Sequence, residues 1–222
     1  MKNFTLIIPA KYEKESLPSV LNELKKFSFN ILVVLEPTDL ETIDSIKNFD
    51  CTIVHQTNKG YGDALILGIK SVKTEYFCIF NADGSFNPVE ISGMYSSLKD
   101  KEGDIIFGSR YEKNATSEDD TLVTIIGNFI FTKLGNILFK LPITDILYTF
   151  VLGKTKKALD LNLQSQDFTF CVELPIKAQR KNYKIFSTTA HERARIAGKK
   201  KVNAIRDGLY ILKKMIFIFL KN

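Results

Sequence analysis

The amino-acid sequence predicts an α/β fold in which helices cover both faces of a mostly parallel sheet. Short apolar segments alternate with segments of helical spacing through the first half of the chain, a pattern typical of parallel sheets. The chain has 222 residues, which suits one such domain with a short appendage. Hydrophobic residues make up 45% of it, enough to bury a core.

Strands and helices are expected in turn along the first half. Ser16 stands where a helix would begin and Pro18 falls in its first turn, so a helix is predicted over residues 16–27. Two further segments of helical spacing follow at residues 39–49 and 63–72. Buried strands are predicted at residues 4–8, 31–35, 51–55, 76–80 and 104–107.

The pattern changes after residue 111. Residues 112–120 are polar and acidic, and we expect them to form a mobile loop. Residues 122–141 are mostly apolar with polar interruptions, which predicts an amphipathic helix or a helix pair and not a clean membrane span. The later predictions are helices at 154–163 and 168–178 and a strand at 183–189.

The net charge of +6 is unevenly distributed along the chain. Residues 177–222 carry 13 Lys and Arg against two acidic residues, so the rest of the chain is net acidic. A basic segment on an acidic body indicates an anionic partner, and nucleic acid, anionic lipid and phosphorylated substrate are all open at this point. The three cysteines are widely spaced, which predicts reduced thiols in a cytosolic protein. The apolar start of the chain is too short for a signal peptide.

Polar side chains follow four of the predicted strands, at the point where each strand ends. In open parallel sheets, ligands bind outside the carboxyl ends of the strands. The sequence therefore predicts a binding site at this edge. Its components are residues 9–13, Glu36, residues 58–63 and residues 81–85.

Asp83 is the most informative of these residues. A carboxylate at a strand end, beside Gly84, suits Mg²⁺ or Mn²⁺ shared with substrate phosphates, because such ions take one or two protein carboxylates and leave other positions to phosphate and water. The ion would offset negative charge on a departing diphosphate. The alternative is that Asp83-Gly84 only forms a turn after the strand.

Six short motifs run in order along nearly the whole chain. They are Pro9-Ala10-Lys11-Tyr12-Glu13, Asn58-Lys59-Gly60-Tyr61-Gly62-Asp63-Ala64, Asn81-Ala82-Asp83-Gly84-Ser85, Gly108-Ser109-Arg110-Tyr111, Asp145-Ile146-Leu147-Tyr148 and Arg195-Ile196-Ala197-Gly198-Lys199-Lys200-Lys201. Together they resemble the family 2 glycosyltransferases with the GT-A fold, a Rossmann-like arrangement. Within that family they resemble the branch of dolichyl-phosphate mannose synthases and other polyprenyl-phosphate glycosyltransferases.

The resemblance implies a GT-A domain over residues 1–200 and a basic amphipathic helix over residues 201–222. Residues 1–111 would bind the nucleotide sugar and residues 112–200 would form the acceptor side. Asp83 matches the acid that binds Mg²⁺ or Mn²⁺ and is expected to be catalytic. The donor-binding residues that the resemblance implies are Asp83 itself with Pro9, Ala10, Tyr12, Glu13, Glu36, Lys59, Gly60, Asp63, Asn81 and Ala82.

Other residues are expected to contact phosphates or the acceptor. Asp145 is a candidate catalytic base or acceptor-positioning group, since a hydroxyl nucleophile needs a carboxylate to take its proton, whereas a phosphate does not. The alternative for Asp145 is a helix cap. For Arg110 the alternative is an ion pair at a strand end. The residues implied for phosphate or acceptor binding are Ser85, Arg110, Arg195 and Lys201.

The chain departs from the family pattern at four places. Asn81 replaces the first acid of the Asp-x-Asp motif, so the metal would depend on Asp83 alone. Leu35-Glu36 replaces a pair of Asp residues, which leaves the base of the nucleotide open. Tyr12 stands where Asn is usual, and Lys200 where Ser is usual.

The leading interpretation is an inverting glycosyltransferase, metal-assisted, that moves a sugar from a nucleotide-sugar donor to a polyprenyl phosphate or a surface glycan, with no role for nucleic acid. One alternative is a binding or scaffold protein whose donor site has degenerated at Asn81. A second is a nucleotidyltransferase, which would be expected to carry a Gly-rich phosphate loop near its start. The oligomeric state is not predicted.

The C-terminal segment has apolar residues at helical spacing and flanking cations. It is too short to span a bilayer, so we expect an in-plane helix on an anionic leaflet, placing the enzyme on the cytoplasmic side of the cell membrane. The alternative is a helix docked on the domain or on a second subunit. The apolar positions are Val202, Ile205, Leu209, Leu212, Ile216 and Phe219.

Overall fold

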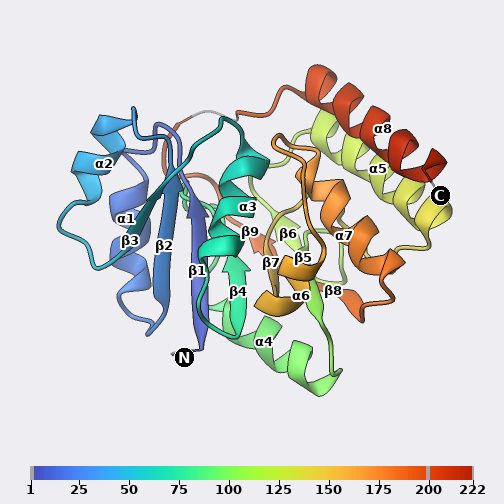
Figure 1. Ribbon diagram of the computed structural model, residues 1–222, viewed down its shortest axis with the longest axis horizontal. Helices are drawn as coiled ribbons and strands as arrows, with labels where there is room; N and C mark the ends of the chain where they lie inside the picture. Colours follow the sequence, from blue (N-terminus) through green and yellow to red (C-terminus); the bar gives the residue numbers. More distant parts are fainter. Residues whose placement is uncertain (1–2, 199–200, 222) are drawn as a thin grey trace.

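Parallel pairing of the apolar segments builds the central sheet of the computed structural model, which describes residues 3–198 and 201–221 (Figure 1). The strand order is β3-β2-β1-β4-β7-β5-β8, and among the described strands of this sheet only β7 runs antiparallel to its neighbours. The predicted mostly parallel sheet is confirmed. The strands are β1 (Phe4–Pro9), β2 (Asn30–Leu35), β3 (Thr52–His55), β4 (Tyr76–Ile79), β5 (Ile105–Ser109), β7 (Val151–Lys154) and β8 (Ile185–Thr189).

Strand β7 is missing from the sequence prediction. Its four residues, Val-Leu-Gly-Lys, are too few to stand out as an apolar segment. Gly153 has to be small here, because an added Cβ would lie 3.0 Å from the Ile105 side chain and 3.1 Å from that of Phe77.

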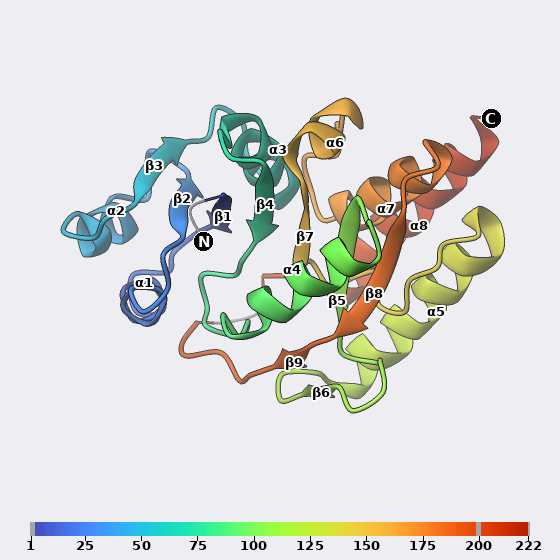
Figure 2. The same cartoon turned by 90° about the horizontal axis from the view of Figure 1, so that it is seen from below.

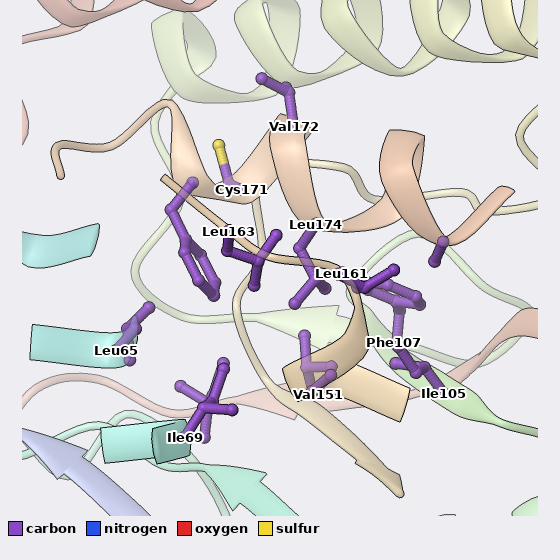
Figure 3. Close-up of a cluster of buried hydrophobic side chains, with 14 of the residues drawn as sticks. Leu65, Ile69, Ile105, Phe107, Val151, Leu161, Leu163, Cys171, Val172 and Leu174 are labelled. Atoms are coloured by element: carbon purple, nitrogen blue, oxygen red, sulfur yellow. The ribbon is translucent and has the colours of Figure 1, made fainter. Parts of the chain in front are cut away.

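Helices cover both faces of the sheet (Figures 1 and 2). Helices α1 and α4 pack on the face to which Leu6 and Ile8 of β1 point, and α3, α6 and α7 pack on the face to which Ile7 points. Figure 3 shows part of the second layer, where Leu65 of α3 and Leu174 of α7 converge. The helices are α1 (Leu17–Leu24), α2 (Leu40–Ile46), α3 (Tyr61–Ser71), α4 (Glu90–Asp100), α5 (Leu122–Phe139), α6 (Thr155–Asp160), α7 (Phe170–Arg180) and α8 (Ala204–Leu220).

The segment 112–120, expected to be a loop, contains a short strand. Thr116–Ser117 forms β6, which pairs parallel with β9 (His191–Glu192) in a second small sheet. The Glu118 N–H donates to the Glu192 carbonyl at 3.0 Å, and the Glu118 carboxylate accepts the Ala194 N–H at 3.1 Å. The acidic segment is thus held against the basic stretch that follows β9, through contacts between residues far apart in the sequence.

Residues 122–139 form a single helix, α5, so of the two predicted arrangements the helix pair is wrong. Its N-terminus carries a capping box made by Thr121 and Thr124. Two of its polar side chains face the protein: Asn128 accepts the Leu147 N–H at 3.1 Å and Thr132 accepts the Ile146 N–H at 3.2 Å. Within the described ranges, α5 is the one helix whose length and composition would allow it to cross a membrane.

Candidate active site

The carboxyl ends of β1, β2 and β4 bring residues from both ends of the chain together. Glu13 follows β1 and Asp83 follows β4, while Arg195 and Lys201 come from the C-terminal stretch after β9. Lys201 forms an ion pair with Glu13, and the Arg195 guanidinium lies 3.7 Å from Asp83. Charged groups that the motifs placed far apart in the sequence therefore share one site.

Asp83 is held at the tip of β4 by its own turn. Its Oδ1 accepts the Ser85 N–H at 3.0 Å and the Ser85 hydroxyl at 2.7 Å. The other oxygen, Oδ2, points toward Arg195. The Asp83 side chain is therefore fixed by one oxygen and offers the second to a cation, so the turn and the ligand-binding reading are compatible.

Ser85 holds the Asp83 carboxylate in place through hydrogen bonds. It is fully buried, and its hydroxyl also accepts the side-chain N–H of Asn81 at 3.2 Å. A buried hydroxyl with these partners orients Asp83, so the predicted contact of Ser85 with phosphate is not supported by its position. Ala82 is buried in the apolar core.

Arg195 joins the site to the acidic segment before α5. Its guanidinium donates to both oxygens of Asp119, at 2.8 and 3.3 Å, and the hydrogen bond with Asp119 raises its pKa. The Ile196 N–H donates to the Asp83 carbonyl at 2.8 Å, and Ile196 packs so closely on Gly84 that a Cβ there would lie 2.5 Å away. The C-terminal stretch therefore lies directly against the Asp83 turn.

The predicted strip from Pro9 to Glu13 folds back toward α2. The Tyr12 N–H donates to Asp39 at 2.7 Å and the Glu13 N–H donates to Thr42 at 3.0 Å. Tyr12 is exposed and has a φ of 54°, whereas Pro9 and Ala10 are buried. Of this strip, Lys11 and Tyr12 are exposed, whereas Glu13 is buried and its carboxylate is paired with Lys201.

Ser16 precedes α1 as predicted but makes no side-chain cap. Its hydroxyl donates to Glu13 at 2.6 Å. Glu36, at the end of β2, forms an ion pair with Lys11 at 2.8 Å. In both cases a side chain near the strand ends fixes a carboxylate of the predicted donor site.

The turn that carries Lys59, Gly60 and Asp63 owes its glycines to packing. A Cβ on Gly60 would lie 2.1 Å from the Gln166 carbonyl oxygen, and Gly60 has a φ of 122°. The Asp63 carboxylate accepts from Gln56 at 3.3 Å, and Lys59 is exposed. Asp63 thus orders the turn, and its predicted contact with the donor stays a prediction.

Arg110 and Asp145 are engaged with each other. Asp145 is fully buried, and Arg110 donates from Nε to Oδ2 at 2.8 Å and from Nη2 to Oδ1 at 3.0 Å. Arg110 also contacts Asp120 at 3.0 Å and Glu192 at 3.3 Å. The arrangement favours the alternative reading of Arg110, an ion pair at a strand end.

The same arrangement bears on the catalytic prediction for Asp145. Both of its oxygens accept from Arg110, and neither reaches the surface. It therefore cannot take a proton from a substrate in this conformation. The helix-cap alternative is also wrong, because no helix begins in residues 145–150.

A divalent cation fits the site through few protein ligands. Among the described residues, no three His, Cys, Asp or Glu side chains converge on a metal position. Asp83 Oδ2 lies 3.7 Å from the Arg195 guanidinium and takes no part in the hydrogen bonds to Ser85, which leaves it for an ion that takes most of its oxygens from phosphate and water. Asp83 would hold such an ion.

Asp119 is a site residue that the sequence analysis missed. It lies in a segment without periodicity, and its partner Arg195 is 76 residues further along the chain. The one available signal was the opposite charge of the acidic segment and the C-terminal stretch. Two cations of the last motif, Lys199 and Lys200, lie outside the described residues.

Comparison with known proteins agrees with the motifs. The family model for glycosyl transferase family 2 matches residues 5–160. An uncharacterized glycosyltransferase of Mycobacterium tuberculosis (strain ATCC 25618 / H37Rv) is 24% identical over 207 residues, which are 93% of each chain. The UDP-N-acetylglucosamine–dolichyl-phosphate N-acetylglucosaminyltransferase of Methanococcus voltae is 24% identical over 205 residues, 81% of each chain.

Solved structures share the fold. Glucosyl-3-phosphoglycerate synthase from Mycobacterium tuberculosis, in complex with Mn²⁺, UDP and glucosyl-3-phosphoglycerate, has a TM-score of 0.73 at 12% identity and covers 99% of this chain and 78% of its own. Mannosyl-3-phosphoglycerate synthase from Rubrobacter xylanophilus has a TM-score of 0.75 at 11% identity, with 99% and 74% covered. The predicted GT-A fold is confirmed. Since the family model spans well over half of its residues, the chain belongs to glycosyl transferase family 2.

Proposed function

We propose that this glycosyltransferase moves a sugar from a nucleotide-sugar donor to a polyprenyl phosphate, with inversion and with help from Mg²⁺ or Mn²⁺. The observation that carries the proposal is Asp83 at the tip of β4, with one oxygen fixed by Ser85 and the other facing Arg195. This gives the site one carboxylate for a cation and one guanidinium for phosphate. The Mn²⁺ and UDP of a solved structural neighbour support this assignment.

The cationic side chains of the proposed donor site are paired with carboxylates of the protein itself. A bound divalent ion would stabilise the negative charge that grows on the nucleoside diphosphate as it leaves. Arg195 and Lys201 would bind the diphosphate in place of Asp119 and Glu13, their present partners. Tyr12 and Glu36, at the ends of β1 and β2, would frame the nucleoside.

The burial of Asp145 favours a phosphate acceptor over a glycan hydroxyl. A phosphate oxygen can attack the anomeric carbon as an anion: the new C–O bond forms while the bond to the diphosphate breaks, and the electron pair leaves with the nucleoside diphosphate. No proton has to be removed, so no base is needed. Asp145, the one candidate base from the motifs, is closed off by Arg110. The dolichyl-phosphate acceptor in the name of the Methanococcus voltae relative supports the same choice.

Donor hydrolysis tests the proposal. Wild-type protein would be incubated with a panel of UDP- and GDP-sugars, with and without Mn²⁺ or Mg²⁺. We expect metal-dependent release of the nucleoside diphosphate from one donor. Asp83→Ala should lower that turnover by about 10²-fold or more, because a metal contributes several kcal/mol to the transition state.

Asp50→Ala is the matched control, because Asp50 is an exposed carboxylate outside the site. It should retain wild-type turnover. Equal activity in Asp83→Ala would remove the assigned metal ligand. A folded wild-type sample that binds no nucleotide sugar in calorimetry, with or without Mn²⁺, would support the scaffold alternative instead.

A further inference from the structure

The apolar stripe that the sequence predicts for the C-terminal helix lies on the exposed side of α8, for example at Ile205 and Leu209. Its buried side is formed by Ile211, Met215 and Ile218, which join the core cluster. On the opposite side Ile205 is 79% exposed and Leu220 is 74% exposed. The helix is therefore apolar on both faces, and the domain covers only one of them.

Helix α5 lies beside α8 at the same end of the molecule (Figures 1 and 2). The two helices contact each other, for example through the rings of Phe139 and Phe219, whose centroids are 6.0 Å apart. On α5, Ile126 is 58% exposed and Ile137 is 73% exposed. Most of the exposed large apolar side chains among the described residues thus lie on this one pair of helices. Apolar residues scattered singly over a surface would not gather in this way.

We call the exposed apolar side chains of these two helices the α5–α8 surface. Its members are Leu122, Val123, Ile126, Phe129, Ile130, Ile137, Ile205, Leu209, Ile216, Phe217 and Leu220.

The exposed charged side chains of the two helices are all basic. Asp207 is the one acidic residue of α5 and α8, and it is buried, where it accepts from Asn203 and Arg206. Basic side chains stand exposed among the apolar residues instead. They are Lys133, Arg206 and Lys213, with Lys140 and Lys221 at the helix ends. An apolar surface on two helices whose exposed charged side chains are all basic is complementary to an anionic lipid leaflet.

We propose that the α5–α8 surface docks the enzyme on an anionic bilayer, with both helices lying in the plane of the interface. The sequence suggested membrane contact through the C-terminal segment alone; the structure assigns half of the surface to α5. A second copy of the chain is a poorer occupant, because each copy would bring the same cations to the contact. Docking does not depend on the identity of the sugar donor.

Helix α5 is held in the fold too firmly to leave it and cross the bilayer. Asn128 and Thr132 satisfy backbone N–H groups of residues 146 and 147, and Phe139 belongs to the core cluster. Removing α5 from the domain would strand these groups without partners. An in-plane position leaves all of these contacts intact.

The α5–α8 surface is linked to the active site through the first turn of α5. The Thr124 hydroxyl donates to Asp120 at 3.0 Å, and Asp120 accepts from Arg110 at 3.0 Å. The neighbouring Asp119 holds Arg195 beside Asp83. Docking by α5 would therefore bring the bilayer next to the acceptor side, where the phosphate of a membrane-anchored acceptor is needed.

Vesicle flotation with the full-length chain tests the proposal. The probes are vesicles of phosphatidylcholine mixed with phosphatidylglycerol, and vesicles of phosphatidylcholine alone. Wild type should float with the anionic vesicles, and less at high salt. The double variant Ile126→Gln/Ile130→Gln should lower the partition coefficient by about tenfold or more, because each side chain loses its apolar burial in lipid.

Two further variants separate the electrostatic contribution to membrane binding from the apolar one and test whether the apolar effect is specific to this surface. Lys133→Gln/Lys213→Gln should weaken binding to anionic vesicles and leave binding to phosphatidylcholine unchanged. Leu40→Gln/Val89→Gln is the matched control, because these side chains are equally exposed but lie on other elements. Deleting α8 is not a clean test, since Ile211 and Met215 are part of the core.

Each outcome decides the matter. Loss of flotation in the α5 variant alone, with unchanged circular dichroism and thermal unfolding, supports the proposal. Flotation that is equal in wild type, the α5 variant and the control overturns it. It is also overturned if wild type does not float but sediments as a dimer that Ile126→Gln/Ile130→Gln dissociates, because the surface would then join two copies. Donor hydrolysis in solution would be unaffected in either case, so this test and that of the proposed function fail separately.

Discussion

Arg110 shows how far a residue can differ from the role that its motif implies. It lies among three carboxylates that are themselves nearly inaccessible, those of Asp145, Asp120 and Glu192. Burial opposes its charge, but the combined interactions with Asp145, Glu192 and Asp120 outweigh burial, and the pKa of Arg110 is raised. Burial raises the pKa of Glu192 as well, because the attraction of Arg110 offsets burial only in part. The guanidinium is thus the counter-ion that keeps this acidic cluster in the fold.

Replacing Arg110 should therefore destabilise the protein strongly. Arg110→Gln leaves three buried carboxylates without their cation, and breaking a buried pair in this way costs about 3–5 kcal/mol. We expect a loss of that size in the free energy of unfolding, measured by urea denaturation. Lys47→Gln is the control, since its exposed pair with Asp44 should contribute below about 1 kcal/mol. Equal, small losses in both variants would show that the cluster is not energetically coupled to Arg110.

At the scale of elements, Glu173 of α7 ties three segments together. Its carboxylate accepts the backbone N–H groups of Gln164 at 3.0 Å and Ser165 at 2.7 Å, and it forms ion pairs with Lys177 at 2.9 Å and with Lys214 of α8 at 3.6 Å. The loop that it holds is the one that packs on Gly60 and Gly62. Glu173 is thus a buried, paired structural carboxylate.

This carboxylate should make stability depend on pH in the acid range. Burial raises the pKa of Glu173, but its hydrogen bonds from Lys177, Gln164 and Ser165 outweigh burial and lower the pKa from 4.5 to about 2. A lowered folded-state pKa stabilises the protein above the unfolded value, and this stability is lost as the pH falls from about 4.5 to about 2. The amount is about 3 kcal/mol, at about 1.4 kcal/mol for each pH unit.

Urea unfolding of wild type and Glu173→Gln between about pH 6 and about pH 2 measures this contribution, because that range includes both the unfolded and the folded pKa of Glu173. The difference between the two proteins should shrink as the pH falls. The control, Glu102→Gln, removes an exposed acid paired with Lys184 and should follow wild type. A constant difference between wild type and Glu173→Gln across this range would contradict the assigned pKa.

The elements that the sequence predicts well are those with a local pattern. The buried strands β1, β2, β4 and β5 are mostly apolar and polar residues follow them closely, so they are found without knowing the fold. Strand β7 is missed because four residues with a glycine carry no such pattern. Strand β6 is missed because it pairs only with β9, which lies 75 residues away along the chain.

The candidate site is predicted in its positions and not in its pairings. Asp83, Glu13 and Arg195 are recognised from their motifs, and the structure brings all three to one edge. That Asp119 holds Arg195, and that Arg110 closes off Asp145, depends on packing between distant segments. The outward face of α8 is likewise hidden in the sequence, because the helix has apolar residues on two sides and the sequence does not indicate which side the domain will cover.

At the scale of the whole molecule, the uneven charge of the chain has a structural use. The acidic stretch before α5 lies against the basic stretch after β9: Asp119 pairs with Arg195, and Glu118 accepts the Ala194 N–H. Lys201 similarly reaches back to Glu13 near the start of the chain. The free protein thus holds the cations that we propose to bind phosphate on its own carboxylates.

Removing one of these carboxylates should therefore tighten ligand binding while weakening the free protein. Arg195 has to leave Asp119 before it can bind a diphosphate, and Asp119→Asn removes that cost of about 1 kcal/mol, which is roughly fivefold in affinity. With UDP and Mn²⁺ as the probe, calorimetry should show a lower Kd for Asp119→Asn than for wild type, and thermal unfolding without ligand should show a lower Tm. Asp50→Asn, an exposed acid away from the site, should change neither quantity. If Asp119→Asn binds UDP and Mn²⁺ no more tightly than wild type, Arg195 keeps its carboxylate partner in the complex and the diphosphate must be held by other cations.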